Sequence, residues 1–284
     1  MPIKMKELIK KLLKRLGIEV KIHSKSKPNV YARISKYAIL NQKNQEILNR
    51  ENISRGNYVW GALCGTDLAA NLNLDKISLL EFGVAGGNGL VELENIATEL
   101  EKMYDIEIEV YGFDTGTGLT KPKDYRDLPH LWGEGHYPMD VEKLKSRLKK
   151  ASLILGDIEN TIDAFIESNP APIAFISFDM DMYTPTVTSF RIFEGDHGIL
   201  LPRIHCYFDD IMGYSYSDYN GERLAISEFN QHHPMKKISP IYCLENYVQN
   251  HPFWAKKFYL AHIFDHQSYN SNDGMLVNPD LPLV

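Results

Sequence analysis

Five short apolar runs along the chain each end in one or two carboxylates. They are residues 77–81, 108–114, 152–157, 173–179 and 205–210, and the acids that end them are Glu81, Asp114, Asp157, Asp179 and the pair Asp209-Asp210. Runs of this length, bounded by polar or glycine-containing turns, are typical of buried parallel strands. Ligands of open α/β sheets bind beyond the carboxyl ends of the strands. The pattern therefore predicts that these acids converge on one crevice.

Helical patterns separate the runs and predict the rest of the fold. Residues 31–75 have helical spacing with a break at Arg55-Gly56-Asn57, and further helices are expected after each strand, one of them capped by Asp140 and one beginning at Thr184-Pro185. Two later apolar stretches, 238–243 and 258–264, are expected to pair as an antiparallel hairpin on the sheet. The fold class predicted is α/β, a doubly wound, mostly parallel seven-stranded sheet.

Two loops are rich in aromatic residues. Residues 115–139 form a segment long enough to be a lid or a binding loop. The aromatic and histidine side chains could form a pocket for an acceptor molecule or simply a hydrophobic lid, and they are His130, Trp132, His136 and Tyr137 on this segment and Tyr214, Tyr216 and Tyr219 on the loop after residue 210.

Positive and negative residues are unevenly distributed along the chain. Residues 1–27 carry a net charge of +7, whereas the whole chain of 284 residues carries −6, so the remainder is acidic and argues against a nucleic-acid partner. Residues 1–16 predict a basic amphipathic helix that either contacts an anionic membrane surface or packs on the domain or on a second copy of the chain. The predicted organisation is a basic helix and linker at 1–28, a helical cap at 29–76 and an α/β domain at 77–284.

No apolar run reaches the length of a membrane span, and no signal peptide is recognisable at the start. The cysteines are Cys64, Cys206 and Cys243, and their wide spacing gives neither a disulfide framework nor a zinc pattern. We therefore expect a cytoplasmic protein.

A glycine-rich turn, residues 83–89, directly follows the first predicted strand. Such turns suit phosphates, NAD and S-adenosylmethionine (SAM) alike, because glycine lets a ligand approach the start of the following helix. Glu81 is placed to face a ligand's ammonium group, Asp114 to bind two ribose hydroxyls and Asp157 to accept from an adenine amino group. Their structural alternatives are a salt bridge, a turn cap and a helix cap, respectively.

Five segments together resemble a class I SAM-dependent methyltransferase, and within that class the macrocin O-methyltransferase family, which methylates sugar hydroxyls. They are EFGVAGG (81–87), YGFDTGTGL (111–119), GDIENT (156–161), FDMDMYTPT (178–186) and FDDI (208–211). The resemblance spans roughly residues 55–265 and implies a Rossmann-like methyltransferase fold. The residues expected to contact SAM are Glu81, Gly83, Gly86, Gly87, Asp114, Thr115, Asp157, Ile158 and Asp179.

Asp179, Asp209 and Asp210 are expected to meet and to bind a divalent cation such as Mg²⁺, because three close carboxylates repel one another without one. The resemblance implies the same three ligands; capping of the loop by Asp209-Asp210 is the alternative. Asp181 is the first candidate for the base that takes the acceptor's proton, with Asp179 beside it in the catalytic group, and His205 is the second.

The sequence therefore predicts a metal-assisted O-methyltransferase acting on a hydroxyl of a sugar or glycoside. Alternatives are a methyltransferase for another vicinal diol such as a catechol, and a catalytically silent protein that keeps the adenosyl pocket. The expected partner is a small-molecule acceptor, and a homo-oligomer remains open.

Overall fold

The structure, a computed structural model, describes residues 31–270, with side chains from residue 38 onward. The predicted basic helix and its linker lie outside the described residues. The chain divides into two compact units, residues 35–275 and residues 1–34 with 276–284. Of the second unit only residues 31–34 are described, and they are helical. Within the described part of the chain, no helix combines the length and apolar character needed to cross a membrane.

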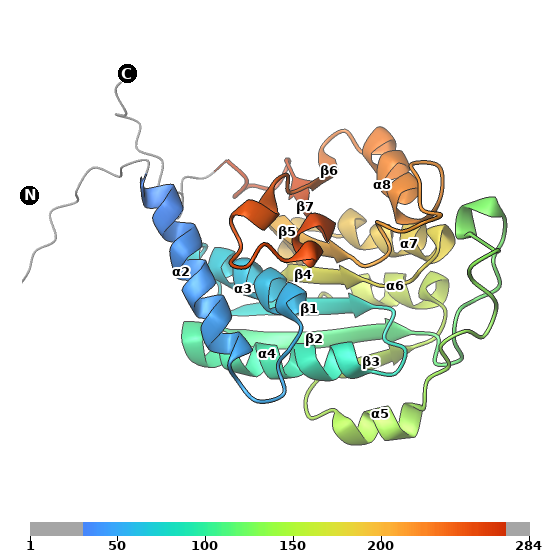
Figure 1. Ribbon diagram of the computed structural model, residues 1–284, viewed down its shortest axis with the longest axis horizontal. Helices are drawn as coiled ribbons and strands as arrows, with labels where there is room; N and C mark the ends of the chain where they lie inside the picture. Colours follow the sequence, from blue (N-terminus) through green and yellow to red (C-terminus); the bar gives the residue numbers. More distant parts are fainter. Residues whose placement is uncertain (1–30, 271–284) are drawn as a thin grey trace, which may run out of the picture. The chain divides into compact units, whose positions relative to one another are not determined.

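The larger unit is built on one seven-stranded sheet (Figure 1), whose strand order is β3-β2-β1-β4-β5-β7-β6. β1 to β5 run parallel, and β7 pairs antiparallel with both β5 and β6. The predicted fold class and the C-terminal antiparallel hairpin are thus confirmed. The strands are β1 (Lys76–Phe82), β2 (Glu107–Asp114), β3 (Ser152–Leu155), β4 (Ile173–Phe178), β5 (Leu200–Phe208), β6 (Lys236–Pro240) and β7 (Phe258–Ile263).

Helices cover both faces of the sheet. Figure 1 shows α3 and α4 in front of the strands and α6 and α7 behind them. The helices are α2 (Tyr31–Leu48), α3 (Gly56–Asn71), α4 (Asn88–Tyr104), α5 (Val141–Arg147), α6 (Ile158–Glu167), α7 (Tyr183–Ser189) and α8 (Gly221–His232), with short 3₁₀ turns η1 (Tyr125–Asp127), η2 (Phe190–Glu194), η3 (His197–Ile199), η4 (Leu244–Asn246) and η5 (Phe253–Lys257). The predicted helical break near Arg55 is present as the gap between α2 and α3.

Strand β5 is longer than predicted, because it begins at Leu200 and not at His205. Leu200, Leu201 and Ile204 are buried, so the sheet extends over them. The register between β4 and β5 is interrupted between the pairs Ile173–Leu200 and Phe175–His205. Pro202 falls in this interruption, and irregular positions of this kind are where strands tolerate proline. The expectation that His205 starts the strand is therefore wrong.

Aromatic rings lock together the strand ends that carry the acids. Phe178 of β4 stacks on Phe208 of β5 with ring centroids 4.6 Å apart, and on Phe82 of β1 at 5.5 Å. All three side chains are fully buried. Each such pair adds about 0.5–1.5 kcal/mol beyond the burial of its area. The ends of β1, β4 and β5 are thereby held side by side.

Candidate active site

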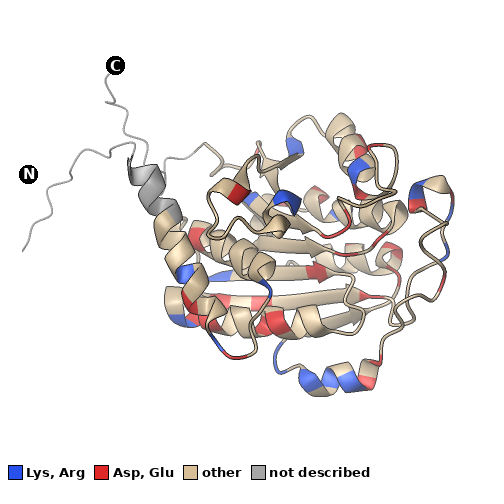
Figure 2. Ribbon diagram, viewed as in Figure 1, with Lys and Arg blue, Asp and Glu red and all other residues tan. Residues whose placement is uncertain are grey.

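The carboxyl ends of the parallel strands are joined by backbone hydrogen bonds. The N–H of Asp179 donates to Phe82 (2.9 Å), that of Asp209 to Phe178 (2.9 Å), and that of Gly83 to Phe113 (2.9 Å). Acidic residues mark the ends of several strands at this edge of the sheet (Figure 2). The sequence therefore placed acids at the edge where ligands of such sheets bind.

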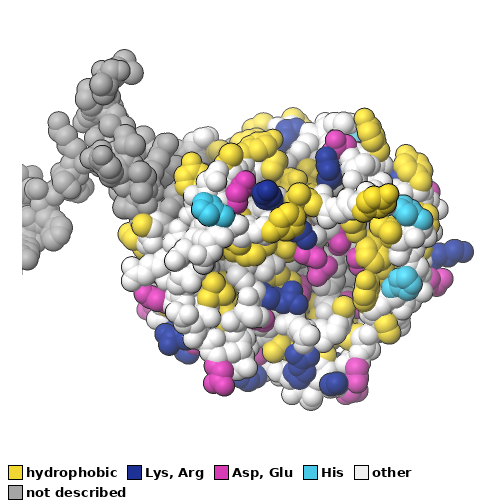
Figure 3. Space-filling view, viewed as in Figure 1, with side chains coloured by type: hydrophobic (Ala, Val, Ile, Leu, Met, Phe, Trp, Pro, Cys, Tyr) yellow, Lys and Arg dark blue, Asp and Glu magenta, His cyan; other side chains and the backbone are white. Residues whose placement is uncertain are grey.

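A cavity of about 380 Å³ opens at this edge. In the space-filling view, Asp and Glu side chains gather in a hollow next to hydrophobic ones (Figure 3). The residues that line the cavity are Phe82, Gly83, Ala85, Phe113, Asp114, Thr115, Gly118, Leu119, Thr120, Trp132, His136, Tyr137, Gly156, Asp157, Ile158, Asp179, Met180, Asp181, Met182, Pro185, Asp209 and Asp210.

The glycines of the turn have different roles. Gly83 has a φ of +84°, and a Cβ there would lie 1.8 Å from the carbonyl oxygen of Asp179, so only glycine lets β1 and β4 end this close together. Gly87 also has a positive φ and lies against Leu144, while Gly86 faces open space. Gly83 lines the cavity, but Gly86 and Gly87 do not. Ala85 does, a position that sequence reasoning passed over because it is not a glycine.

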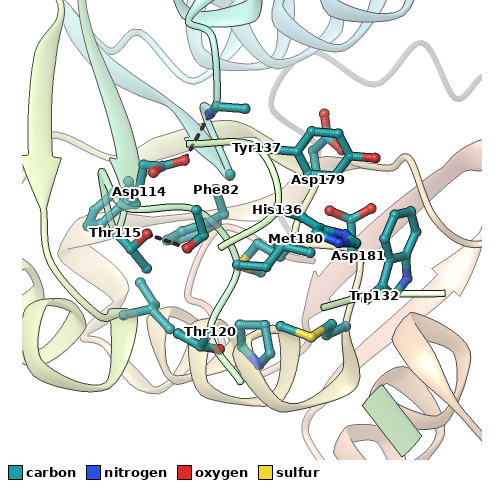
Figure 4. A pocket seen from close by; sticks show the side chains of 18 of the residues that line it. Phe82, Asp114, Thr115, Thr120, Trp132, His136, Tyr137, Asp179, Met180 and Asp181 are labelled. Atoms are coloured by element: carbon teal, nitrogen blue, oxygen red, sulfur yellow. Dashed lines mark hydrogen bonds between the residues drawn. The ribbon is translucent and has the colours of Figure 1, made fainter. Parts of the chain in front are cut away.

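Asp114 organises the glycine turn (Figure 4). One carboxylate oxygen accepts the backbone N–H groups of Val84 (3.0 Å) and Ala85 (2.8 Å), and the other accepts that of Gly116 (2.7 Å). A carboxylate has about four acceptor sites, so capacity for a ligand hydroxyl remains. Beside it, the hydroxyl of Thr115 donates to the carbonyl of Gly118 (2.6 Å).

Asp157 caps a helix. Its carboxylate accepts the backbone N–H of Glu159 (3.0 Å) at the start of α6, which is the structural alternative weighed for this residue. Asp157 and Ile158 nevertheless both line the cavity. The adenine-binding role stays a prediction.

Glu81 lies behind the cavity and not on its wall. It is 2% exposed, and its Oε1 accepts the hydroxyl of Tyr58 (2.7 Å) from α3. Its Oε2 has no hydrogen-bond partner within the described residues. Burial raises the pKa of Glu81 to about 8. Glu81 therefore does not line the cavity, and its contact with a ligand's ammonium group stays a prediction.

Replacing Glu81 with Gln is expected to stabilise the protein increasingly as pH rises. The raised pKa of Glu81, about 8 in the folded protein, means that the folded state holds a proton that the unfolded state has released. Stability is therefore lost as pH rises from about 4.5 toward 8, by at most about 1.4 kcal/mol per pH unit. Gln removes this loss and still accepts from Tyr58.

Urea denaturation at about pH 5 and pH 8 measures the effect. The free energy of unfolding of the variant minus that of the wild type should be larger at the higher pH. The exposed Glu159→Gln is the matched control and should show no such trend. An equal difference at both pH values would contradict the assignment.

Four aspartates form an acid cluster on the other side of the cavity: Asp179, Asp181, Asp209 and Asp210. Burial, and then repulsion from Asp210, raises the pKa of Asp179 to about 7 and that of Asp181 to about 8. Burial and the charge of Asp209 raise the pKa of Asp210 to about 6. Sequence reasoning placed these acids together, and the structure has them on one cavity wall.

Two of these four aspartates, Asp209 and Asp210, already have hydrogen-bond partners. Asp210 accepts the backbone N–H of Asp181 (3.0 Å) and the hydroxyl of Tyr216 (3.1 Å). Asp209 accepts the hydroxyl of Tyr207 (2.9 Å) and pairs with Lys257 (3.1 Å). Asp181 has a φ of +64°, a left-handed conformation that Asp adopts more readily than most residues.

A metal site is not formed by these side chains as they stand. Within residues 31–270, no group of three or more His, Cys, Asp and Glu side chains has an arrangement that could hold a metal ion. The donor type, carboxylate oxygen, suits Mg²⁺, but the pairing of Asp209 with Lys257 already supplies one positive charge. The three predicted ligands share the wall without forming a coordination shell.

Glu222 is a member of this region that sequence reasoning missed. It lies in the first turn of α8, is fully buried, and neither carboxylate oxygen has a side-chain partner within the described residues. Burial and the charges of Asp210, Asp179 and Asp209 raise its pKa well above the usual value. An acid in the first turn of a helix looks ordinary in a sequence, so nothing there marked it.

The predicted aromatic pocket is present in part. Trp132, His136 and Tyr137 line the cavity, and Figure 4 shows them beside Asp179 and Asp181. The side chains of Tyr214 and Tyr219 are largely exposed, and Tyr216 instead supports Asp210. His130 is exposed, and neither it nor His205 lines the cavity.

No protein-family model matches this chain, and no curated protein matches it. Among solved structures, the chain is similar to the calicheamicin methyltransferase CalS11, with 21% identity, coverage of 67% of this chain and 83% of that chain, and a TM-score of 0.42. It is also similar to an O-methyltransferase from Bacillus cereus in complex with S-adenosylhomocysteine (SAH), with 11% identity, coverage of 90% and 97%, and a TM-score of 0.39.

A further similar structure is the MycE methyltransferase from the mycinamycin biosynthetic pathway, in complex with Mg, SAH and mycinamycin VI. The identity is 12%, the alignment covers 75% of this chain and 58% of that chain, and the TM-score is 0.35. All three are methyltransferases by name, the class of protein that the sequence motifs resemble. The similarity is low in each case.

Proposed function

We propose that this protein is a SAM-dependent O-methyltransferase that acts on a hydroxyl of a sugar or glycoside. The observation that carries the proposal is a single cavity with two chemically different ends. One end has the glycine turn with Asp114 and Thr115, and the other has Asp179, Asp181 and Asp210. Such a cavity suits a nucleoside at one end and a hydroxylated acceptor at the other.

The nucleoside end combines polar backbone and apolar walls. Asp114 holds the turn in shape and keeps one acceptor site for a ribose hydroxyl. The apolar side chains of Phe82, Phe113 and Ile158 also line the cavity, where they would exclude water from the adenine ring. Bound SAM would supply an electrophilic methyl group, which an acceptor oxygen attacks in line as the carbon–sulfur bond breaks and its electron pair returns to sulfur.

Asp181 is the residue we assign to the acceptor's proton. It lines the cavity, and no hydrogen bond to its side chain is found within residues 31–270, so its carboxylate is available to an acceptor hydroxyl. Its backbone N–H is fixed by Asp210, which orients the side chain. The pKa of about 8 suits a base that must take a proton near neutral pH.

We also propose that Asp179, Asp209 and Asp210 take up a divalent cation in the working enzyme. The support is the crowding of acids on one cavity wall, where burial and mutual repulsion raise the pKa values of Asp179 and Asp210. A bound cation would lower the pKa of an acceptor hydroxyl. Within residues 31–270 the three carboxylates form no coordination shell as they stand, so their side chains would have to rearrange to bind the cation.

Calorimetric titration with SAH and, separately, with NAD tests the class of protein. The expected result is SAH binding at micromolar affinity or tighter, about −8 kcal/mol or more favourable, with none for NAD. Phe113 and Asp114 suit a nucleoside in general, so the comparison of the two ligands is the decisive part. NAD binding without SAH binding would refute the proposal.

Two alternatives are distinguished by the acceptor. The acid cluster would serve a catechol or another vicinal diol equally well, and a panel of glycosides and catechols assayed for SAH formation separates the two. A silent adenosyl-binding protein would bind SAH and methylate none of them. The buried and mutually repelling acids favour an enzyme, since a scaffold has no use for them.

A further inference from the structure

The long segment 115–139 is organised although it contains little regular structure. Its two arms pair through two backbone hydrogen bonds, from Leu119 to His136 (2.8 Å) and from Gly135 to Leu119 (2.8 Å). A Cβ at Gly118 would lie 2.4 Å from the carbonyl oxygen of His136, so the pairing requires glycine there. The segment therefore forms a closed loop, and its two arms are held together near Thr115.

At the tip of this loop, Asp127 has a buried carboxylate that has no part in the methyl transfer proposed above. It is 1% exposed. One oxygen accepts the backbone N–H of Thr184 (2.7 Å), and the other accepts the hydroxyl of Thr184 (2.8 Å) and the N–H of Lys123 (2.8 Å). Thr184 is the second residue of α7, and the residue before that helix, Met182, provides no side-chain cap. Asp127 thus caps α7 from 57 residues away.

The neighbours of Asp127 strengthen this attachment. Arg126 lies with its guanidinium 4.5 Å from the ring centroid of Tyr183 and donates to its hydroxyl (3.1 Å). That hydroxyl donates to Glu228 (2.5 Å) on α8. On the other side, Leu128 is fully buried with a φ of +55°. Arg126 and Asp127 therefore attach the segment to α7 and, through Tyr183, to α8.

This attachment connects the two walls of the cavity. α7 starts two residues after Asp181, and the arm that returns from Asp127 carries Trp132, His136 and Tyr137. We propose that Asp127 is a positioning residue: by capping α7 it holds the returning arm closed over the acid end of the cavity. The inference rests on the proposed function only in taking this cavity as the site of methyl transfer.

The test compares Thr184→Val with Thr184→Ser, because Val removes the hydroxyl that Asp127 accepts and Ser keeps it. Hydrogen exchange of residues 118–137 and the dissociation rate of SAH are measured in the full chain. Val is expected to raise both by about tenfold, and Ser by less than about twofold. Asp127→Asn should raise exchange at least as much as Val, because it also disturbs the bonds that Asp127 accepts from the N–H groups of Thr184 and Lys123.

Three outcomes would overturn the proposal. They are unchanged exchange in the Val variant, a rise spread over the whole protein, and no rescue by Ser. If Val prevents folding, Tyr183→Phe removes only the hydroxyl between Arg126 and Glu228, and it should raise exchange in the same segment. A wild type that does not bind SAH would refute the proposed function, while the exchange comparison would still decide the role of Asp127.

Discussion

Replacing Asp181 with Asn is expected to lower kcat by about 10²–10⁴-fold while SAH affinity stays within about threefold of the wild type. Asn keeps the size of the side chain but cannot take a proton. The backbone N–H that Asp210 accepts is unaffected by the substitution, so the local chain path should persist. Methyl transfer from SAM to a panel of glycosides, followed as SAH formation, measures kcat, and calorimetry measures the affinity.

The exposed Asp196→Asn is the matched control and should retain full turnover. Loss of turnover in Asp181→Asn together with lost SAH affinity would point to a distorted cavity and not to a missing base. Turnover within tenfold of the wild type would exclude Asp181 as the base. His136, which lines the same cavity, would then be the next group to examine.

Removal of divalent cations is expected to lower turnover by about 10²-fold or more, with recovery on addition of Mg²⁺. Asp179→Ala and Asp209→Ala should cause a similar loss that Mg²⁺ does not restore. Burial and repulsion raise the pKa of Asp179 to about 7, so ionised Asp179 costs stability above neutral pH, and its removal should not lower the melting temperature there. Activity assays with EDTA and thermal unfolding of both variants provide the measurements.

Full turnover in EDTA, or in both alanine variants, would show that no cation takes part. The variant Asp209→Ala carries a second consequence, because it leaves Lys257 without its carboxylate partner. Asp179 has no such cation partner at hydrogen-bond distance among the described residues. The Asp179 variant therefore leaves no lysine unpaired, and calorimetry with SAH separates a lost cation from a lost contact between Asp179 and SAM.

Much of the site was predictable because it follows from strand polarity. Parallel strands separated by helices must end at one edge, so the acids after each apolar run had to share that edge. Asp114, Asp179 and Asp210 are on the cavity wall for this reason. Glu81 is the exception. Its side chain faces Tyr58 of α3, and the direction of a side chain at a strand end is decided by the helix that packs there.

The residues that sequence reasoning missed depend on contacts between distant segments. Asp127 is an unremarkable acid in a polar loop until Thr184 approaches it. Glu222 looks like an ordinary helix-start acid until α8 buries it behind Asp210. No local pattern carries this information, because burial is a property of the packed chain.

By itself, the sequence determined the seven-stranded fold class, the antiparallel hairpin and the acidic edge, since hydrophobic periodicity and strand polarity are local properties that survive any detail of packing. Only the tertiary structure decided which acids reach the cavity, which of them are neutralised by burial and which are already paired. Those outcomes depend on distances of a few ångströms between side chains far apart in the chain, and a pKa or a coordination shell responds to such distances and not to spacing along the sequence.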